Sequence, residues 1–397
     1  MICDLPQEVL EKILTYLQVR NLGKCVSVCK KWKSLVDSQT FQTAMAQVEG
    51  PKSFLLFHGL NWQMTLEQII VDGWIVFDIN NSSWFTLRNN FLLSHLNEYS
   101  SSYLPTFSAV SEGGLICVFF RNWGLRNGKW NLLGLVCNPV TKAVRKLPCL
   151  ELDFTDLNVV IILHMDEHGG RAYKVFFLSK VTFCLYDSEA KIKSWDTLHR
   201  PSSKGDTPLS GVMLRSTLYI LWRSDFGRLA VAAYNINKHV WSEKVHVPAL
   251  PANIIEKSLS PPQLQLVIVN HDIFLTGIFT CLSCRANCSI IWKVMEANDE
   301  KGIVLDELAR TCVKEMIQLS LVSKTPTPEV AENCIVVTER TSQGGLFVMI
   351  YDLHGKVWRH IPHSCKATCE CCRFCIGLTR LCQPQGRWMS LNMGAKV

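Results

Sequence analysis

Long apolar runs are missing from this 397-residue sequence. Its most hydrophobic stretches, residues 115–120 and 159–163, are far shorter than the roughly 18 residues that suggest a membrane span. The first residues, MICDLPQEV, have neither the basic segment nor the apolar segment of a secretory signal. We therefore expect no membrane partner, and a protein that works in the cytoplasm, the nucleus or both.

Concentrated charge is also missing. Charged residues make up 19% of the chain, and 41 Lys and Arg against 34 Asp and Glu give a net charge of +7. The basic residues are scattered, and only Lys30, Lys31 and Lys33 lie close together. Because nucleic-acid binding needs a dense basic patch, no nucleic-acid partner is expected. The apolar content of 48% favours a globular fold, and the length favours a small domain followed by a large one.

The sequence has no recognisable catalytic motif. A phosphate-binding glycine loop, a G-x-S-x-G elbow and an H-E-x-x-H helix are all absent. The segment DEHGGR at residues 166–171 gathers two carboxylates and a histidine, but it lies between two apolar runs and is more typical of a hairpin loop. ERTSQGG, at residues 339–345, is interpreted in the same way. A non-catalytic protein is expected.

The 18 cysteines are plentiful but irregularly placed. A cluster of cysteines near the end of the chain comprises Cys365, Cys369, Cys371, Cys372, Cys375 and Cys382. Its two C-x2-C pairs share Cys372, and the other such pair, Cys281 and Cys284, lies some 80 residues away. Zinc knuckles or thiol chemistry remain alternatives. Buried, reduced cysteines such as Cys117, Cys137 and Cys184 are the preferred interpretation, with no metal and no cofactor.

The N-terminal 40 residues read as short helices. Pro6 suits a first helical turn, and Asn21 suits the N-cap of a second helix. One apolar stripe at helical spacing consists of Leu10, Ile13, Leu14 and Leu17. The segment VCKKWKSLVDS predicts a third helix. Because domains below roughly 40 residues usually need outside help to fold, we expect this apolar face to be covered by another part of the chain or by a partner.

The segment LPQEVLEKILTYLQVRNLGKCVSVCKKWKSLVDSQTF, residues 5–41, resembles an F-box. In that family the F-box docks on a Skp-type adaptor, which joins it to a cullin–RING ubiquitin ligase. The resemblance implies that the docking or supporting residues are Leu5, Pro6, Ile13, Leu14, Leu22, Val28 and Trp32. Gly23 departs from the family, where a bulky residue is commoner, and it should weaken the second helix by about 1 kcal/mol. The alternative is a helical cap that only stabilises the rest of the chain.

One unit recurs in the β-rich remainder of the chain. VFDINNSSW, AAYNINKHVW and MIYDLHGKVW each end a strand in an aromatic residue and Asp or Asn, with Trp six residues later. LYDSEAKIKSW has two extra residues, VCNPVTKAVRKLP has Val144 in place of Trp, and a copy near Glu296 is degenerate. Each copy predicts a hairpin in which Asp or Asn bonds its own backbone. A period near 50 residues is typical of four-stranded kelch-like propeller blades.

The β-rich region is similar to the kelch and F-box-associated domains that follow many plant F-boxes. SFLLFHG, SEGGLICVFF and VCNPVTKAVRKLP carry the likeness, although only Gly113 and Gly114 resemble the kelch double glycine. The fold expected is α+β and multidomain, with a three-helix F-box at residues 1–45 and an all-β propeller of six blades at 46–397. SFLLFHG would close the ring by joining the last blade. A β-sandwich, or a repeat of four to seven blades, stays open.

Loops between the second and third strands of a blade are the expected substrate-binding sites. They emerge on the face opposite the Asp and Asn turns, and loops on rigid scaffolds commonly bind partners. Trp and Arg are frequent interface hot spots. The candidate substrate-binding residues are Trp123, Arg126, Trp130, Arg223, Phe226 and Arg228. The alternative is that Trp130 belongs to a strand edge and that the arginines are simply solvated.

The sequence thus predicts a substrate-recognition subunit of a Skp–cullin–F-box ubiquitin ligase. It would bind a Skp-type adaptor through the helices and an unknown protein target through the propeller. Two alternatives are a kelch-type scaffold that assembles no ligase and a zinc or thiol protein that uses the C-terminal cysteines.

Elemental analysis of the purified chain tests the last alternative. Because the two terminal C-x2-C pairs share one cysteine, they do not form two separate zinc knuckles, and we expect well below one zinc per chain. Stoichiometric zinc that survives dialysis against a mild chelator would contradict the preferred interpretation of the cysteines.

Overall fold

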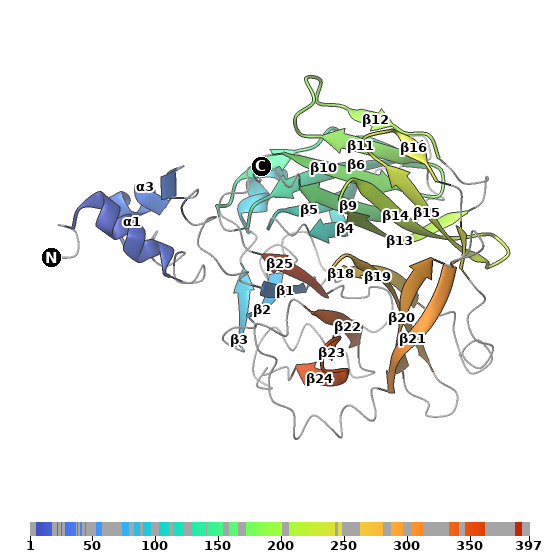
Figure 1. Ribbon diagram of the computed structural model, residues 1–397. Helices are drawn as coiled ribbons and strands as arrows, with labels where there is room; N and C mark the ends of the chain where they lie inside the picture. Colours follow the sequence, from blue (N-terminus) through green and yellow to red (C-terminus); the bar gives the residue numbers. More distant parts are fainter. Residues whose placement is uncertain are drawn as a thin grey trace.

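The computed structural model describes two parts of the chain, a helical N-terminal part and a β-rich remainder (Figure 1). The described residues are 5–17, 28–36, 53–57, 74–78, 83–87, 90–96, 103–110, 114–122, 129–139, 141–153, 159–165, 172–200, 206–242, 245–247, 263–280, 287–296, 303–312, 333–340, 346–361 and 386–390, with positions 22, 25, 38, 40, 41 and 44. None of the helices in these ranges is long and apolar enough to cross a membrane.

Two helices of the N-terminal part are described, α1 (Gln7–Thr15) and α3 (Lys30–Val36). Pro6 stands at the N-cap of α1, and its carbonyl accepts from the Leu10 N–H at 3.0 Å. Of the second predicted helix only Leu22 and Cys25 are described, both in helical conformation. Figure 1 shows α1 and α3 to one side of the β-strands.

The helices form a small core of their own, whereas we expected their apolar face to be covered by another part of the chain or by a partner. The side chains of this helical core are Leu10, Leu14, Leu22, Cys25, Leu35, Val36 and Phe41, with Leu17 and Trp32 packed against them. Leu14 and Phe41 are completely buried. Phe41 and Leu22 come from outside the two described helices, which is how so short a segment encloses a core.

The rest of the described chain is mostly β, in six antiparallel sheets. The first sheet contains β1 (Ser53–Phe57), β2 (Trp74–Asp78), β3 (Ser83–Leu87) and β25 (Gly386–Ser390). The second contains β4 (Tyr103–Val110), β5 (Ile116–Asn122), β6 (Lys129–Cys137), β7 (Val144–Lys146) and β8 (Leu150–Asp153). The third contains β9 (Val160–Met165), β10 (Tyr173–Leu178), β11 (Phe183–Asp187) and β12 (Trp195–Thr197).

The remaining three sheets follow in chain order. The fourth contains β13 (Thr207–Leu214), β14 (Thr217–Arg223), β15 (Leu229–Asn235), β16 (Val240–Trp241) and β17 (Val245–His246). The fifth contains β18 (Gln263–Val269), β19 (Asp272–Thr280), β20 (Asn287–Glu296) and β21 (Ile303–Cys312). The sixth contains β22 (Cys334–Arg340), β23 (Leu346–Asp352) and β24 (Val357–Ile361). Two short helical turns, η2 (Asn90–Leu92) and α6 (Leu93–Leu96), precede β4.

The two ends of the β region meet in the first sheet. β25 pairs antiparallel with β1, from Ser53 opposite Ser390 to Phe57 opposite Gly386. The expectation that SFLLFHG joins the last blade is wrong for its described residues 53–57, because β1 pairs with β2 and the late strand β25 joins the first sheet instead. Such pairing covers the outer edge of β1 and ties the first sheet to the last part of the chain.

The recurring unit is a hairpin between two consecutive strands of a sheet, as predicted. Its Asp or Asn side chain accepts from backbone N–H groups of the same turn: Thr141 to Asn138 at 3.1 Å, Glu189 to Asp187 at 2.8 Å, Lys238 to Asn235 at 3.0 Å, and His354 and Gly355 to Asp352 at 3.0 Å. Three turns continue with a residue at positive φ four positions on, namely Lys142, His239 and Lys356. Where the chain reverses, the side-chain oxygen of Asp or Asn thus accepts from backbone N–H groups that a neighbouring strand would otherwise pair with.

The aromatic residue before the Asp or Asn pairs across the hairpin with the Trp. The register sets Phe77 opposite Trp84, Tyr186 opposite Trp195, Tyr234 opposite Trp241 and Tyr351 opposite Trp358. Ring centroids lie 5.7 Å apart for Tyr186 and Trp195, and 4.9 Å apart for Tyr234 and Trp241. Cross-strand aromatic pairs of this kind stabilise a hairpin, which explains why the two aromatic positions recur together.

The Trp side chain also joins one sheet to the sheet before it. Trp195 Nε1 donates to the Pro148 carbonyl at 2.8 Å, and Trp241 Nε1 donates to the His199 carbonyl at 2.7 Å. Each acceptor lies just beyond a strand of the preceding sheet, β7 for Pro148 and β12 for His199. The same Trp therefore closes its own hairpin and fastens that hairpin to a neighbour.

Replacing Trp241 with Phe tests this connection. Trp241→Phe keeps an aromatic ring opposite Tyr234 but removes the N–H donor, so we expect a loss of about 1 kcal/mol of stability in urea unfolding. Trp358→Phe is the matched control, because Trp358 holds the same place in the repeat and its Nε1 has no acceptor among the described residues. An equal loss in both variants would contradict a stabilising role for the bond to His199.

Two candidate interaction surfaces

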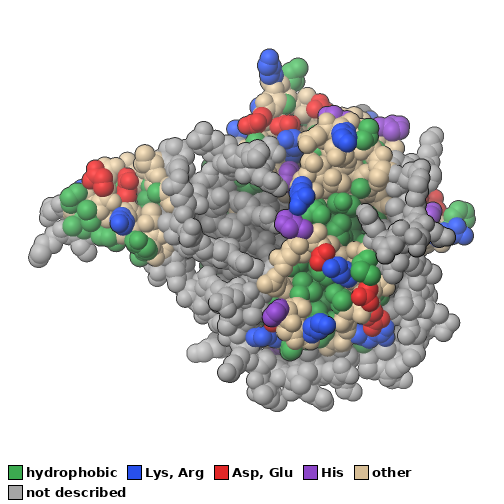
Figure 2. Space-filling view, viewed as in Figure 1, with side chains coloured by type: hydrophobic (Ala, Val, Ile, Leu, Met, Phe, Trp, Pro, Cys, Tyr) green, Lys and Arg blue, Asp and Glu red, His purple; other side chains and the backbone are tan. Residues whose placement is uncertain are grey.

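Helix α1 has two apolar faces instead of the one expected. Leu10 and Leu14 point into the helical core and are at most 1% exposed. Val9, Ile13 and Tyr16 recur at helical spacing on another side, with 44%, 46% and 74% of their surface exposed. We call these three residues the α1 stripe. Figure 2 shows hydrophobic side chains at the surface of the helical part.

The structure divides the seven predicted adaptor-binding residues into two groups. Pro6, Ile13 and Val28 are exposed, and Leu5 is half-buried. Leu14 and Leu22 are buried in the helical core, and the half-buried Trp32 packs against that core. The second group can support a docking surface but cannot form it. Val9 and Tyr16 were missed, although their spacing from Ile13 was visible in the sequence.

Two hairpin tips form the second candidate surface. The first tip is the turn between β10 and β11, where Ser179 Oγ accepts from the Thr182 N–H at 2.9 Å and Val181 is 55% exposed. The second is the turn between β14 and β15, where Ser224 Oγ accepts from the Arg228 N–H at 3.1 Å. Lys180 Nζ lies 3.2 Å from Asp225 Oδ1, so the two tips touch.

Phe226 stands at the end of the second tip with 93% of its surface exposed. The Gly227 N–H donates to the Ser224 carbonyl at 2.9 Å, and Gly227 has a φ of +77°. A glycine suits this position because side chains rarely adopt positive φ. Backbone hydrogen bonds within the turn hold the phenyl ring in solvent. Burying this ring against a partner would contribute about 1.5–3 kcal/mol to binding.

Three of the six predicted substrate-binding residues lie together on the second tip. Arg223 is half-buried, whereas Phe226 and Arg228 are exposed. Trp123 and Arg126 lie outside the described residues, and Trp130 lies in β6 with its side chain not described. Lys180 and Val181 were missed, because they belong to another repeat and nothing in the sequence places them beside residue 225.

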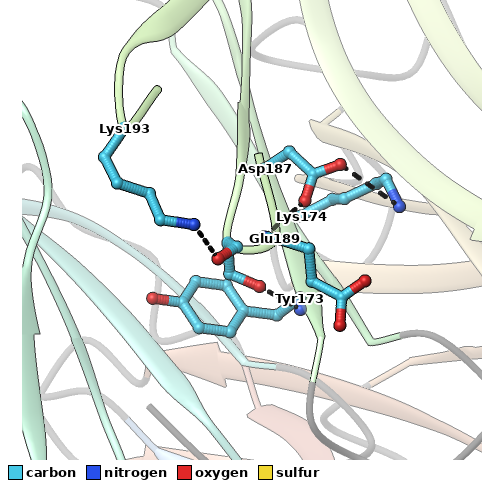
Figure 3. A network of polar contacts seen from close by, with 6 residues as sticks. Tyr173, Lys174, Asp187, Glu189 and Lys193 are labelled. Carbon is cyan, nitrogen blue, oxygen red and sulfur yellow. Dashed lines mark hydrogen bonds and ion pairs between the residues drawn. The ribbon is translucent and has the colours of Figure 1, made fainter. Parts of the chain in front are cut away.

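A polar network at the opposite end of the third sheet holds the turn after β11 (Figure 3). The Tyr173 N–H donates to Ser188 Oγ at 2.7 Å, and the Lys193 ammonium donates to the Ser188 carbonyl. Lys174 Nζ lies 3.6 Å from Asp187 Oδ2. Burial raises the pKa of the Tyr173 phenol, so the ring stays neutral. These contacts join neighbouring strands and the turn between them, which is a structural role.

The described cysteines are mainly packing residues. Cys117, Cys137 and Cys184 are buried, as predicted. Burial raises the pKa of each of these thiols, and that of Cys334 to about 12, which disfavours the reactive thiolate at neutral pH. The described ranges contain no cluster of His, Cys, Asp and Glu suited to a metal. The C-terminal cysteine cluster, Cys281 and Cys284 lie outside the described residues.

The N-terminal segment carries an F-box domain. A comparison with protein families matches residues 2–43 to the F-box domain. Similar curated proteins are F-box only protein 13 and F-box only protein 6 of Arabidopsis thaliana, 24% and 23% identical over 59% and 74% of this chain. These matches cover 48% and 56% of the two relatives, about half of their length. The chain thus has plant F-box homologues.

Other matches are weaker or more distant. SKP1-interacting partner 15 of Arabidopsis thaliana is 22% identical over 60% of this chain and 64% of that protein. Among solved structures, the Dos1 propeller aligns over 74% of this chain and 66% of its own, with 13% identity and a TM-score of 0.34. An α-L-arabinanase of Penicillium chrysogenum aligns over 66% and 82%, with 11% identity and a TM-score of 0.41.

Adjacent residues of α1 provide a stability test of the two faces. Leu14→Ala should cost about 2–5 kcal/mol, because it leaves a cavity in the helical core. Ile13→Ala should cost less than about 1 kcal/mol, because Ile13 is half in solvent already. Hydrogen exchange of the α1 amides measures both effects. Exchange should be faster in Leu14→Ala and unchanged in Ile13→Ala. Equal protection in the two variants would contradict the assignment of inner and outer faces.

Proposed function

We propose that this protein is the substrate-recognition subunit of a Skp–cullin–F-box ubiquitin ligase. The observation that carries the proposal is an F-box domain at residues 2–43 that buries its own core yet exposes the α1 stripe. A relative whose name is SKP1-interacting partner 15 supports the same assignment. The F-box, at residues 1–45, would bind a Skp-type adaptor with the α1 stripe, Leu5, Pro6 and Val28 as contact residues.

The remaining residues, 46–397, would form a six-bladed kelch-like propeller that presents the target. Six successive antiparallel sheets and the pairing of β25 with β1 support this arrangement. Contacts also run from sheet to sheet, between β4 and β9, β9 and β13, β13 and β18, β18 and β22, and β22 and β25. A closed ring of sheets accounts for all of these contacts and leaves no sheet without a neighbour.

The mechanism follows from rigid presentation. The adaptor would connect the F-box to a cullin–RING assembly, and the propeller would hold a target protein near the ubiquitin-charged enzyme. Holding the target raises the effective concentration of its lysines at the site of transfer. Associated subunits would carry out the covalent chemistry, and this chain would contribute binding energy and orientation.

Co-purification with a Skp-type adaptor tests the proposal. Wild type should bind, whereas Ile13→Ala/Tyr16→Ala and Leu5→Ala/Pro6→Ala should each lose at least about tenfold in affinity, because both remove exposed apolar contact surface. Ile192→Ala is the matched control, since Ile192 is 76% exposed in the β region and should not affect adaptor binding.

Two results would contradict the proposal in different ways. If wild type fails to bind the adaptor while α1 keeps its hydrogen-exchange protection, the F-box is only a stabilising cap. If the chain binds the adaptor but the complex does not recruit a cullin, the protein is a scaffold instead of a ligase subunit.

A further inference from the structure

The two touching hairpin tips combine exposed apolar side chains with positive charge. The hairpin-tip surface is the name used here for Lys180, Val181, Arg223, Phe226 and Arg228. Phe226 and Val181 are the two exposed large apolar side chains of the touching tips. They come from different sheets, and the ion pair between Lys180 and Asp225 links the two tips. A surface held together by two hairpins and an ion pair is preorganised, which lowers the entropy cost of binding.

The charges on this surface are unequal. The residues of the two tips include three cations, Lys180, Arg223 and Arg228, but only one carboxylate, that of Asp225, which already pairs with Lys180. No carboxylate of the described chain lies within ion-pairing distance of Arg223 or Arg228. Arginine binds carboxylates with two parallel hydrogen bonds, so these two side chains are suited to acidic groups on a partner.

We propose that the hairpin-tip surface binds an acidic peptide segment that carries one large apolar side chain. The apolar side chain would pack on Phe226 and Val181, and neighbouring Asp or Glu residues would pair with Arg223 and Arg228. Phe and Arg together supply both contact area and charge, the combination common in binding hot spots. This inference rests on the proposed function, since it names the class of target that the propeller would present.

The described residues of the opposite face offer exposed aliphatic side chains near lysines, such as Ile192, Val240 and Val357, instead of an exposed phenyl ring near arginines. There the Asp and Asn turns use their side chains to accept from their own backbone, as Asp187, Asn235 and Asp352 do. The exposed Ile192 of that face has Lys191 and Lys193 beside it, but Lys193 already bonds to the Ser188 carbonyl. The hairpin tips instead leave two arginines and a phenyl ring in position for a partner.

Selection from a phage-displayed library of random dodecapeptides, with the full-length tagged chain as bait, tests the inference. We expect enriched peptides to carry several Asp or Glu residues around one aromatic or long aliphatic residue. A synthetic copy of an enriched peptide should then lose at least about tenfold in affinity, by fluorescence anisotropy, for Phe226→Ser and for Arg223→Glu/Arg228→Glu. Binding to wild type should also weaken as salt rises.

Matched variants on the opposite face control for general effects. Ile192→Ser removes an exposed apolar side chain, and Lys238→Glu/Lys356→Glu reverses two charges, so both should bind within about twofold of wild type. The Arg223→Glu/Arg228→Glu variant should bind a peptide with Lys in place of each acid better than wild type does. This reversal of preference would not follow from misfolding.

Three outcomes would overturn the inference: no enrichment, enrichment of basic or neutral peptides, or equal binding by wild type and the hairpin-tip variants. Adaptor binding is measured on the same preparations. Loss of peptide binding with adaptor binding intact contradicts only the inference about the hairpin-tip surface. Peptide binding as predicted, without adaptor binding, contradicts only the ligase assignment.

Discussion

Packing between neighbouring sheets is the interaction on which the β region depends. One core joins the second and third sheets, where the rings of Phe119 and Phe177 lie 5.4 Å apart. Further cores join the third to the fourth, the fourth to the fifth and the fifth to the sixth sheet. A sheet that is apolar on both faces must be covered twice. The proposed ring would meet this need for every sheet, and the pairing of β25 with β1 brings a late strand to the first sheet.

The helical segment must likewise cover its apolar side chains, on a smaller scale. It encloses Leu14 and Phe41 completely, but so short a segment cannot cover every apolar residue that it carries. Tyr16 and Val28 remain mostly in solvent. Exposed apolar surface on an otherwise well-packed domain is typical of a binding face. The internal core and the exposed face therefore serve different purposes, and substitutions on the two should separate stability from binding.

Local chemistry was predictable from the sequence, whereas contacts between repeats were not. The turns at Asp187, Asn235 and Asp352 followed from the tendency of these side chains to bond their own backbone. The partner of the Trp241 indole N–H, the carbonyl of His199, could not be found this way, because it depends on how two sheets stack. The same holds for Lys180 and Asp225, which lie 45 positions apart. The two faces of α1 were predictable, but the spacing of Val9, Ile13 and Tyr16 was overlooked.

The repeat constrains the sequence more strongly at one end of the sheets than at the other. At the Asp and Asn turns the sequence is constrained, because an acceptor side chain and an aromatic pair must recur for the hairpin to form. At the other end a tip uses a residue such as Ser179 or Ser224 to accept a backbone N–H, and the second tip also uses Gly227 at positive φ. The remaining tip positions carry no such structural duty, and there the chain places Val181, Phe226 and Arg228 in solvent. Residues that the fold does not require can be selected for a partner.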